Sequence, residues 1–447
     1  MLLDFIDLKK ENGAVYMELY NQINSAIENG IIKKGEKLPS IREAASQLRV
    51  SRTTVENAYL RLCIEGTVES LPQRGYYIRQ GEKRFTAKPE RTQSEERSRY
   101  DFSGRSIDIS AADTEFWKKT VREILRDTEE LTSYGDPRGE AGLRNALSLY
   151  AYKARGVRAS AENIIVGAGI GPLLNILCAL IGKECVIGME NGEFEQASRI
   201  FSDYGINTRV IRGDLNGAVV SELEKNNIGI LFLQPSALSK ISVTGLSSRR
   251  NEFIDWANKS PDRLFIEDDY NGELRYTARS VTAFQGKCPE RTVYIGSFSK
   301  LLLPSVRIAY MVLPDSLSVK LNERLSIYNQ TCGKVEQLAL RRYIETGALE
   351  KHLRRLRKLY NEKSRICGRI ISDLIPSAKQ TLFESSLTVL LEPENREITE
   401  KIYSNARKYG ISLGKTASRN EVRLCFAGIS KDDIYTAIRL LSNDLPQ

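Results

Sequence analysis

The chain has 447 residues, with 66 Lys and Arg against 57 Asp and Glu, a net charge of +9, seven Cys and one His. This length predicts about three folding units and leaves room for a large buried core. A single His excludes zinc peptidase sites of the HExxH type, which need two. That residue, His352, stands in the basic run KHLRRLRKLY, so we expect it at a surface or an interface.

The seven cysteines include no CxxC pair and are odd in number, which is typical of a reduced protein of the cytoplasm. Asp4 and Asp7 interrupt the stretch in which a secretory signal would be apolar, and no run approaches the ~18 apolar residues of a membrane span. We therefore expect a cytoplasmic protein that does not span a membrane.

A polar segment divides the chain into two parts. Residues 81–99, GEKRFTAKPERTQSEERSR, read as an exposed linker between residues 1–80 and residues 100–447. In the longer part, apolar strand segments such as IIVGAG, IGILFLQP, RLFIEDDY and TVYIGSF alternate with helical patterns. This alternation predicts an α/β domain with a mostly parallel sheet, in which we place a small subdomain at about residues 331–447.

Three helices and a hairpin are predicted in residues 1–80. An apolar stripe from Tyr16 to Ile27 indicates the first helix, which ends at Gly30. Ser40-Ile41-Arg42-Glu43 fits a capping box that opens a second helix, and Ser51 caps a third. TVESL, the turn PQRG and YYIR predict a β-hairpin wing, so the segment reads as a winged helix-turn-helix.

Two hypotheses fit such a unit. The N-terminal end of the third helix can enter the major groove of DNA, where Arg, Thr and Asn meet phosphates and base edges. Alternatively, the unit is a small partner-binding domain, which its net charge of only +1 favours. The segment from Lys37 to Ile78, KLPSIREAASQLRVSRTTVENAYLRLCIEGTVESLPQRGYYI, resembles the GntR-type winged helix-turn-helix throughout. The resemblance implies double-stranded operator DNA as the partner, with contacts from Ser40, Arg42, Arg52, Thr53, Thr54 and Arg74.

The longer part carries three segments that suit a phosphate-bearing cofactor. Lys300 follows the strand segment TVYIGSF; burial and neighbouring cations can remove its proton and make it a Schiff-base nucleophile. Ser297, Ser299 and Arg307 surround it in sequence and would bind a phosphate. RLFIEDDY ends in Asp268, Asp269 and Tyr270, which supply the carboxylate and the phenol that a pyridoxal ring needs.

The third segment, IIVGAGIGPLLNIL, predicts a strand, a Gly-rich turn and a helix. The backbone N–H groups of Gly169, Ile170 and Gly171 would then lie at a helix N-terminus suited to phosphate. A dinucleotide fingerprint is the alternative, but Pro172 stands where its third Gly belongs. Taken singly, each segment is also compatible with an ordinary turn or with close helix packing.

The order of these segments resembles the fold type I aminotransferases, and with the N-terminal unit it resembles the MocR/GabR subfamily of regulators over almost the whole chain. The resemblance implies a fold type I pyridoxal 5′-phosphate domain in which Lys300 forms the Schiff base. It also implies roles for Asp268 at the pyridine nitrogen, Tyr270 at the ring oxygen and Arg307 at the phosphate. The remaining implied contacts are Phe194 stacked on the ring, Tyr134 at the partner subunit's phosphate and Arg423 at an effector carboxylate.

One stretch departs from that family. Where it usually has T-P-S-H-Q-F/Y-P-T-G, this chain reads QPSALSKIS from Gln234, so Ala237 and Leu238 replace a His and a Gln. Neither replacement offers a polar group to a cofactor or substrate. We therefore expect a cytoplasmic, homodimeric transcriptional regulator that senses an amino compound or pyridoxal phosphate itself. The alternatives are an active aminotransferase with a DNA-binding appendage and a scaffold that has lost the cofactor.

The positive charge lies far from the N-terminal unit. Residues 341–370 hold 10 Lys and Arg and 3 Asp and Glu, a net charge of +7. Leu353, Leu356 and Leu359 recur every three residues there, which indicates a helix with a buried seam and a solvated basic face. A second hypothesis is that this face, with Arg354, Arg355 and Arg357, contacts DNA phosphates.

Overall fold

The computed structural model describes residues 3–8, 15–79, 98–126, 129–190, 195–214, 217–234, 245–276, 282–383, 386–416 and 418–445. The chain divides into two compact units, Met1–Glu96 and Arg97–Gln447. Among the described helices, none combines the length and the apolar character needed to cross a membrane.

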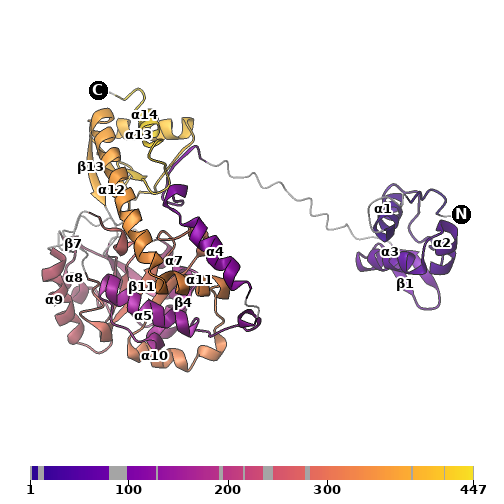
Figure 1. Ribbon diagram of the computed structural model, residues 1–447, viewed down its shortest axis with the longest axis horizontal. Helices are drawn as coiled ribbons and strands as arrows, with labels where there is room; N and C mark the ends of the chain where they lie inside the picture. The colour runs from indigo at the N-terminus through magenta and orange to yellow at the C-terminus, as the bar shows by residue number, and fades with distance from the viewer. Residues whose placement is uncertain are drawn as a thin grey trace. The chain divides into compact units, whose positions relative to one another are not determined.

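The N-terminal unit contains three helices and one hairpin (Figure 1). The helices are α1 (Val15–Glu28), α2 (Ile41–Leu48) and α3 (Arg52–Ile64), and the antiparallel strands are β1 (Val68–Leu71) and β2 (Gly75–Ile78). Leu19, Ile23, Val55 and Leu62 are fully buried between the helices, as the apolar stripes predicted. The predicted winged helix-turn-helix is confirmed.

Local side-chain bonds fix the ends of these helices. The Ser40 hydroxyl accepts from the Glu43 N–H at 3.2 Å, while the Glu43 carboxylate accepts from the Ser40 N–H at 2.9 Å, which is the predicted capping box. Arg49 then takes a left-handed conformation, φ 51°, and ends α2. Ser51 opens α3 by accepting from the Thr54 N–H at 3.1 Å. The tight turn between α2 and α3 therefore lies between Arg49, which ends one helix, and Ser51, which opens the next.

A seven-stranded sheet forms the centre of the second unit, in the order β4-β12-β11-β10-β9-β5-β6. Six strands are parallel and β12 alone runs antiparallel among these seven. The strands are β4 (Ile164–Gly167), β5 (Val186–Glu190), β6 (Asn207–Ile211), β9 (Ile230–Leu233), β10 (Leu264–Asp268), β11 (Thr292–Ser297) and β12 (Ala309–Val312). The mostly parallel sheet predicted from the alternation of segments is confirmed.

Helices cover both faces of this sheet, because its strands are apolar on both sides. Along β4, Ile165 joins a core cluster with α6 (Ile170–Ile181), α7 (Glu195–Asp203) and α10 (Asp315–Asn322), whereas Ile164 and Val166 join the cluster on the other face. That second face carries α5 (Ala141–Arg155), α11 (Lys334–Glu345) and α12 (Ala348–Leu374). The other large-domain helices are α4 (Thr114–Ile124), α8 (Val220–Lys225) and α9 (Gly245–Asn258).

Helix α12 joins this sheet to a smaller C-terminal layer (Figure 1). That layer contains an antiparallel sheet of β13 (Ala378–Phe383), β14 (Thr388–Pro393) and β16 (Val422–Cys425), covered by α13 (Arg396–Lys408) and α14 (Ile434–Leu441). A separate parallel pair, β3 (Tyr100–Phe102) and β15 (Ile411–Leu413), ties the start of the unit to its end. Further short strands, β7 (Gly213–Asp214) and β8 (Gly217–Ala218), form a small hairpin.

Candidate functional site

Lys300 lies in a buried turn just after β11, and only 8% of it is exposed. Its ammonium nitrogen is 3.9 Å from the Cys425 Sγ and 5.2 Å from the centre of the Tyr270 ring. Burial lowers the pKa of Lys300, but the Cys425 thiol and the Tyr270 phenol raise it, and the net shift is upward. The described groups that face Lys300 are thus a thiol and a phenol, and its role as a Schiff-base nucleophile stays a prediction.

Asp268 and Tyr270 follow the neighbouring strand. Asp268 is the last residue of β10 and is 4% exposed, and its Oδ2 accepts from the Gln234 side-chain amide at 2.8 Å. Burial raises the pKa of the Asp268 carboxyl to about 7, although the Gln234 bond opposes this. Because β10 and β11 are parallel neighbours, their carboxyl ends bring Asp268, Tyr270 and Lys300 to one edge of the sheet.

Asp269, the second carboxylate of the EDDY segment, has a structural role. Its two oxygens accept from the Arg155 Nε at 2.6 Å and Nη2 at 3.1 Å, and Tyr294 donates to it at 3.0 Å. Both members of this ion pair are at least 96% buried. Asp269 therefore anchors the turn after β10 to α5, and Asp268 is left as the carboxylate for the site.

Gly169 and Arg307 meet at the N-terminus of α6. A Cβ placed on Gly169 would lie 2.6 Å from the Arg307 Nη2, which is too close for a side chain. The backbone of Gly169 also has φ +90°, which disfavours any residue except glycine. Ile170 and Gly171 form the first turn of α6, which leaves their N–H groups at a helix N-terminus. A guanidinium beside backbone N–H donors is suited to an anion.

Two serines lie on the Lys300 side of the same edge. Ser297 accepts from the Ser299 N–H at 3.3 Å, and the two hydroxyls are also 3.3 Å apart. Both residues are half-buried. Their mutual bond is long, and it holds the hydroxyls in the turn that carries Lys300.

Arg423 and Cys425 come from β16 in the small sheet. Residues two apart in a strand share a face, so Arg423 lies on the side of β16 from which Cys425 contacts Lys300. Tyr134, by contrast, is fully exposed in the loop before α5. Phe194, Ala237 and Leu238 lie outside the described residues.

The remaining contacts of this site were missed in the sequence. Cys425 and Gln234 belong to segments whose apolar pattern indicates only strands. Gly104 also lies close to Lys300, since a Cβ added to this glycine would be 3.7 Å from the Lys300 Nζ.

His352, expected at a surface or an interface, is 3% exposed and hydrogen-bonds the Leu301 carbonyl at 2.8 Å. That expectation was wrong because His352 lies on the buried side of α12, next to the apolar seam. Burial and Arg355 lower the pKa of His352.

Most of the predicted DNA-contact residues of the helix-turn-helix are exposed. Arg42, Arg52, Thr53 and Arg74 are exposed, as is Ser40, although its hydroxyl is used in the capping box. Thr54 is half-buried, and its hydroxyl lies 2.8 Å from that of Ser51. Arg74 stands in the turn between β1 and β2, where the left-handed Gln73 precedes it.

Comparison with known proteins assigns both units. Residues 15–78 match the family described as "Bacterial regulatory proteins, gntR family", and residues 108–441 match "Aminotransferase class I and II". The uncharacterized HTH-type transcriptional regulator YdeL of Bacillus subtilis (strain 168) is 33% identical over 448 residues, with 96% of each chain covered. The chain belongs to the MocR subfamily of GntR-type transcriptional regulators.

One further sequence relative and one solved structure are similar to this regulator. The HTH-type pyridoxine biosynthesis transcriptional regulator PdxR of Corynebacterium glutamicum is 28% identical over 97% of this chain and 96% of its own length. A solved archaeal alanine:glyoxylate aminotransferase is similar in structure, with a TM-score of 0.68 and 20% identity over 77% of this chain and 89% of the enzyme. The regulator thus joins a GntR DNA-binding domain to the fold type I aminotransferase fold.

Proposed function

We propose that this regulator binds pyridoxal 5′-phosphate at Lys300 and adjusts its affinity for operator DNA when an amino compound, or the cofactor itself, occupies that site. The observation that carries the proposal is the buried Lys300 facing Tyr270 beside Asp268, in a chain with a GntR DNA-binding domain. The regulator would act in the cytoplasm as a homodimer.

The described residues fit the cofactor. Arg307 and the N-terminus of α6 form a cradle that a Cβ at Gly169 would fill, as a phosphate site requires. Ser297 and Ser299 would add hydroxyl donors. Asp268 is a buried carboxyl with a raised pKa, so a protonated pyridine nitrogen would restore its charged form. When bound, the cofactor supplies an aldehyde to amines and an electron sink to the bond next to them.

Side chains of the protein would hold the cofactor and bind the effector. Lys300 would hold the cofactor in place and give way to an incoming amine, and Tyr270 would donate to the ring oxygen. Arg423 has the planar donor pair that suits the effector's carboxylate, and it lies on the same face of β16 as Cys425. Tyr134, fully exposed in a single chain, would reach the phosphate bound by the partner subunit, and Phe194 would stack on the ring.

DNA recognition would rest on few side chains. Arg42, Arg52, Thr53, Thr54 and Arg74, with Ser40 at the start of α2, would contact phosphates and base edges. A ligand changes DNA affinity only if it binds two conformations of the regulator differently. Where the family usually has a His and a Gln, this chain has Ala237 and Leu238, and their side chains offer no polar group that could orient a substrate. This difference favours sensing over turnover.

The test compares wild-type protein with Lys300→Ala and, as a matched control, Lys287→Ala, which removes an exposed lysine. Each is incubated with pyridoxal phosphate, reduced with borohydride and mapped by peptide mass. The wild type and the control should carry the label on Lys300, and operator binding should respond to cofactor or amine only in them. A label on other lysines alone would overturn the proposal. Steady conversion of an amino donor and a keto acid would favour the aminotransferase instead.

We also propose that the exposed face of α12 contacts DNA. Six basic residues of α12 are exposed: Lys351, Arg354, Arg355, Lys358, Arg365 and Arg369. We call them the α12 stripe. Glu362 interrupts it but is paired with Lys431 at 2.8 Å. Arg357, grouped with this face in the sequence, belongs elsewhere, because it is half-buried and donates to the Glu273 carbonyl at 2.7 Å.

A further inference from the structure

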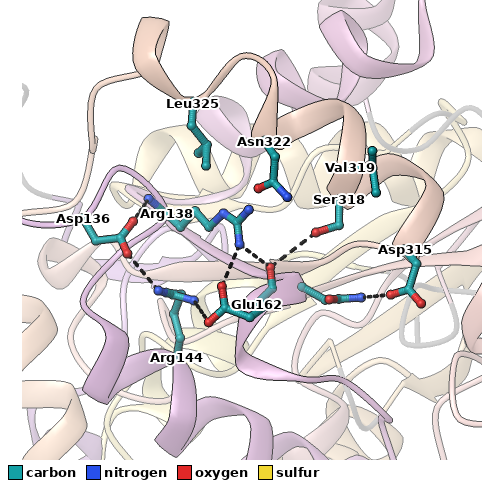
Figure 2. A pocket seen from close by; sticks show the side chains of 10 residues that line it. Asp136, Arg138, Arg144, Glu162, Asp315, Ser318, Val319, Asn322 and Leu325 are labelled. Atoms are coloured by element: carbon teal, nitrogen blue, oxygen red, sulfur yellow. Dashed lines mark hydrogen bonds and ion pairs between the residues drawn. The ribbon is translucent and has the colours of Figure 1, made fainter.

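A cavity lined by polar and charged side chains lies away from Lys300, at the opposite ends of the parallel strands. Figure 2 shows the residues that line it. It is formed by the loop before α5, the residues before β4 and the helix α10, and its volume is about 670 Å³. Lys300 and Asp268 follow the carboxyl ends of parallel strands, whereas this cavity lies where β4 begins and the antiparallel β12 ends. The volume is in the range of small-molecule sites, and the cavity is separate from the proposed cofactor site.

Two buried arginines line this cavity, and they differ in how they are bound. Arg144 is 3% exposed and uses all three guanidinium nitrogens, on two backbone carbonyls and on the Asp136 and Glu162 carboxylates. Arg138 is 6% exposed, and its Nη1 donates to the Glu162 carbonyl at 2.6 Å and to its carboxylate at 3.1 Å. Asp136 and Glu162 therefore balance the two arginine charges.

Among the described residues, the Nε and Nη2 of Arg138 have no hydrogen-bond acceptor. Its Nε is buried without a hydrogen bond, and within the described part of the chain none forms at its Nη2 either. Figure 2 shows this guanidinium between Glu162 and Asn322, facing the cavity. The Nε and Nη2 donors form the edge of an arginine that matches the two oxygens of a carboxylate. A buried donor without an acceptor is costly, so this edge points to a ligand.

The other end of the cavity offers an acceptor. Asp315 is the first residue of α10, and its Oδ1 accepts from the Asn163 amide at 2.6 Å. Among the described residues no donor reaches its other oxygen, and Asp315 is exposed at the rim. Because Asp136 and Glu162 already offset the arginines, Asp315 leaves the cavity with one net negative charge. A simple anion would be repelled by that net negative charge. A simple cation would offer no acceptor to the Nε and Nη2 of Arg138.

We propose that this cavity binds a small amino acid as a zwitterion, with its carboxylate on the Nε–Nη2 edge of Arg138 and its ammonium group at Asp315. Asn322 also lines the cavity, as does Ser318, whose hydroxyl donates to the Glu162 carbonyl at 3.4 Å. The site goes beyond the proposed function, because it needs neither Lys300 nor the cofactor. It would give the regulator a second small-molecule input.

The test uses the full-length Lys300→Ala protein, in which no Schiff base can form at the other site. Glycine, L-alanine, L-glutamate and L-lysine are the probes, and acetate and ethylamine carry only one of the two charges. Saturation-transfer NMR detects binding and calorimetry measures it. At least one amino acid should bind about tenfold or more tightly than either single-charge compound, since two charged contacts are made instead of one.

Three variants decide the outcome. Arg138→Gln and Asp315→Asn should each weaken that binding by about tenfold or more, whereas Lys320→Gln, an exposed change on the same helix, should leave it unaltered. Asp315 lies at the rim, so its variant tests the idea even if Arg138→Gln fails to fold. Unchanged affinity in Asp315→Asn, or equal binding of acetate and amino acids, would overturn the proposal. So would a change of oligomeric state in Arg138→Gln without amino-acid binding, which would mean that a second copy covers the cavity.

Discussion

Neutralising part of the α12 stripe should weaken binding to long operator DNA in a salt-dependent way. The triple variant Lys351→Gln, Arg354→Gln and Lys358→Gln removes three exposed cations within two turns of α12. None of the three forms an ion pair with a carboxylate in the part of the chain that the structure describes. The change should therefore leave the fold intact and alter only the surface charge.

The size of the effect follows from the spacing. From Lys351 to Arg369 the stripe spans 18 residues of helix, about 27 Å at 1.5 Å per residue. Over this length its six basic side chains average about one per 5.4 Å turn of helix. Each phosphate contact contributes about 0.9 to the slope of log affinity against log salt, so three lost contacts lower it by about 2.7. Between about 50 and 200 mM salt, the affinity ratio of wild type to variant should then change about 40-fold.

Fluorescence anisotropy over a salt series measures these slopes. The DNA is an operator recovered by genomic selection, used as the minimal protected duplex and as the same duplex extended on both sides. The difference should appear on the extended duplex, while the minimal duplex, read by the helix-turn-helix, binds both proteins alike. The matched control is Lys183→Gln, Lys287→Gln and Lys320→Gln, which removes three exposed cations elsewhere. Equal slopes for wild type and stripe variant on the extended duplex would refute the reasoning.

Three more predictions test the helix-turn-helix and the buried charged groups of the second unit. Arg52→Ala should weaken operator binding by about 1–3 kcal/mol if it reads a base, with little change in thermal unfolding because Arg52 is exposed; a gel shift on single-base operator variants measures this. Asp269→Asn should destabilise the second unit by about 3–5 kcal/mol, because it removes the carboxylate that forms a buried ion pair with Arg155; an unchanged unfolding temperature would contradict the ion pair's role. Burial raises the pKa of Asp268 to about 7, so the folded state holds this proton more tightly than the unfolded chain does. Its contribution to stability should fall as pH rises from about 4 to 7, and Asp268→Asn should flatten that part of the pH profile in denaturant titrations.

Short-range patterns in the sequence were sufficient for the N-terminal unit. Ser40, Glu43 and Ser51 bond to backbone groups three residues away, so their caps are readable without knowledge of the fold. The position of Lys300 after an apolar strand was readable for the same reason. Its protonation was not, because the pKa of Lys300 depends on Cys425, which lies 125 residues along the chain.

The sequence by itself determined which elements form, since helical and strand periods, caps and turns are local properties of the chain. Tertiary structure decided which of their side chains meet. His352 lies in a strongly basic run, yet it is buried against Leu301 because its side of α12 packs on the turn that carries Lys300. Arg357 belongs to the same basic run, yet it is half-buried and donates to the Glu273 carbonyl. Arg138 and Asp315 line one cavity only because β4 and β12, which are far apart in the sequence, pair as neighbours in the sheet. Such long-range pairings leave no trace in local spacing, and the pKa values and free donors that depend on them appear only in the folded chain.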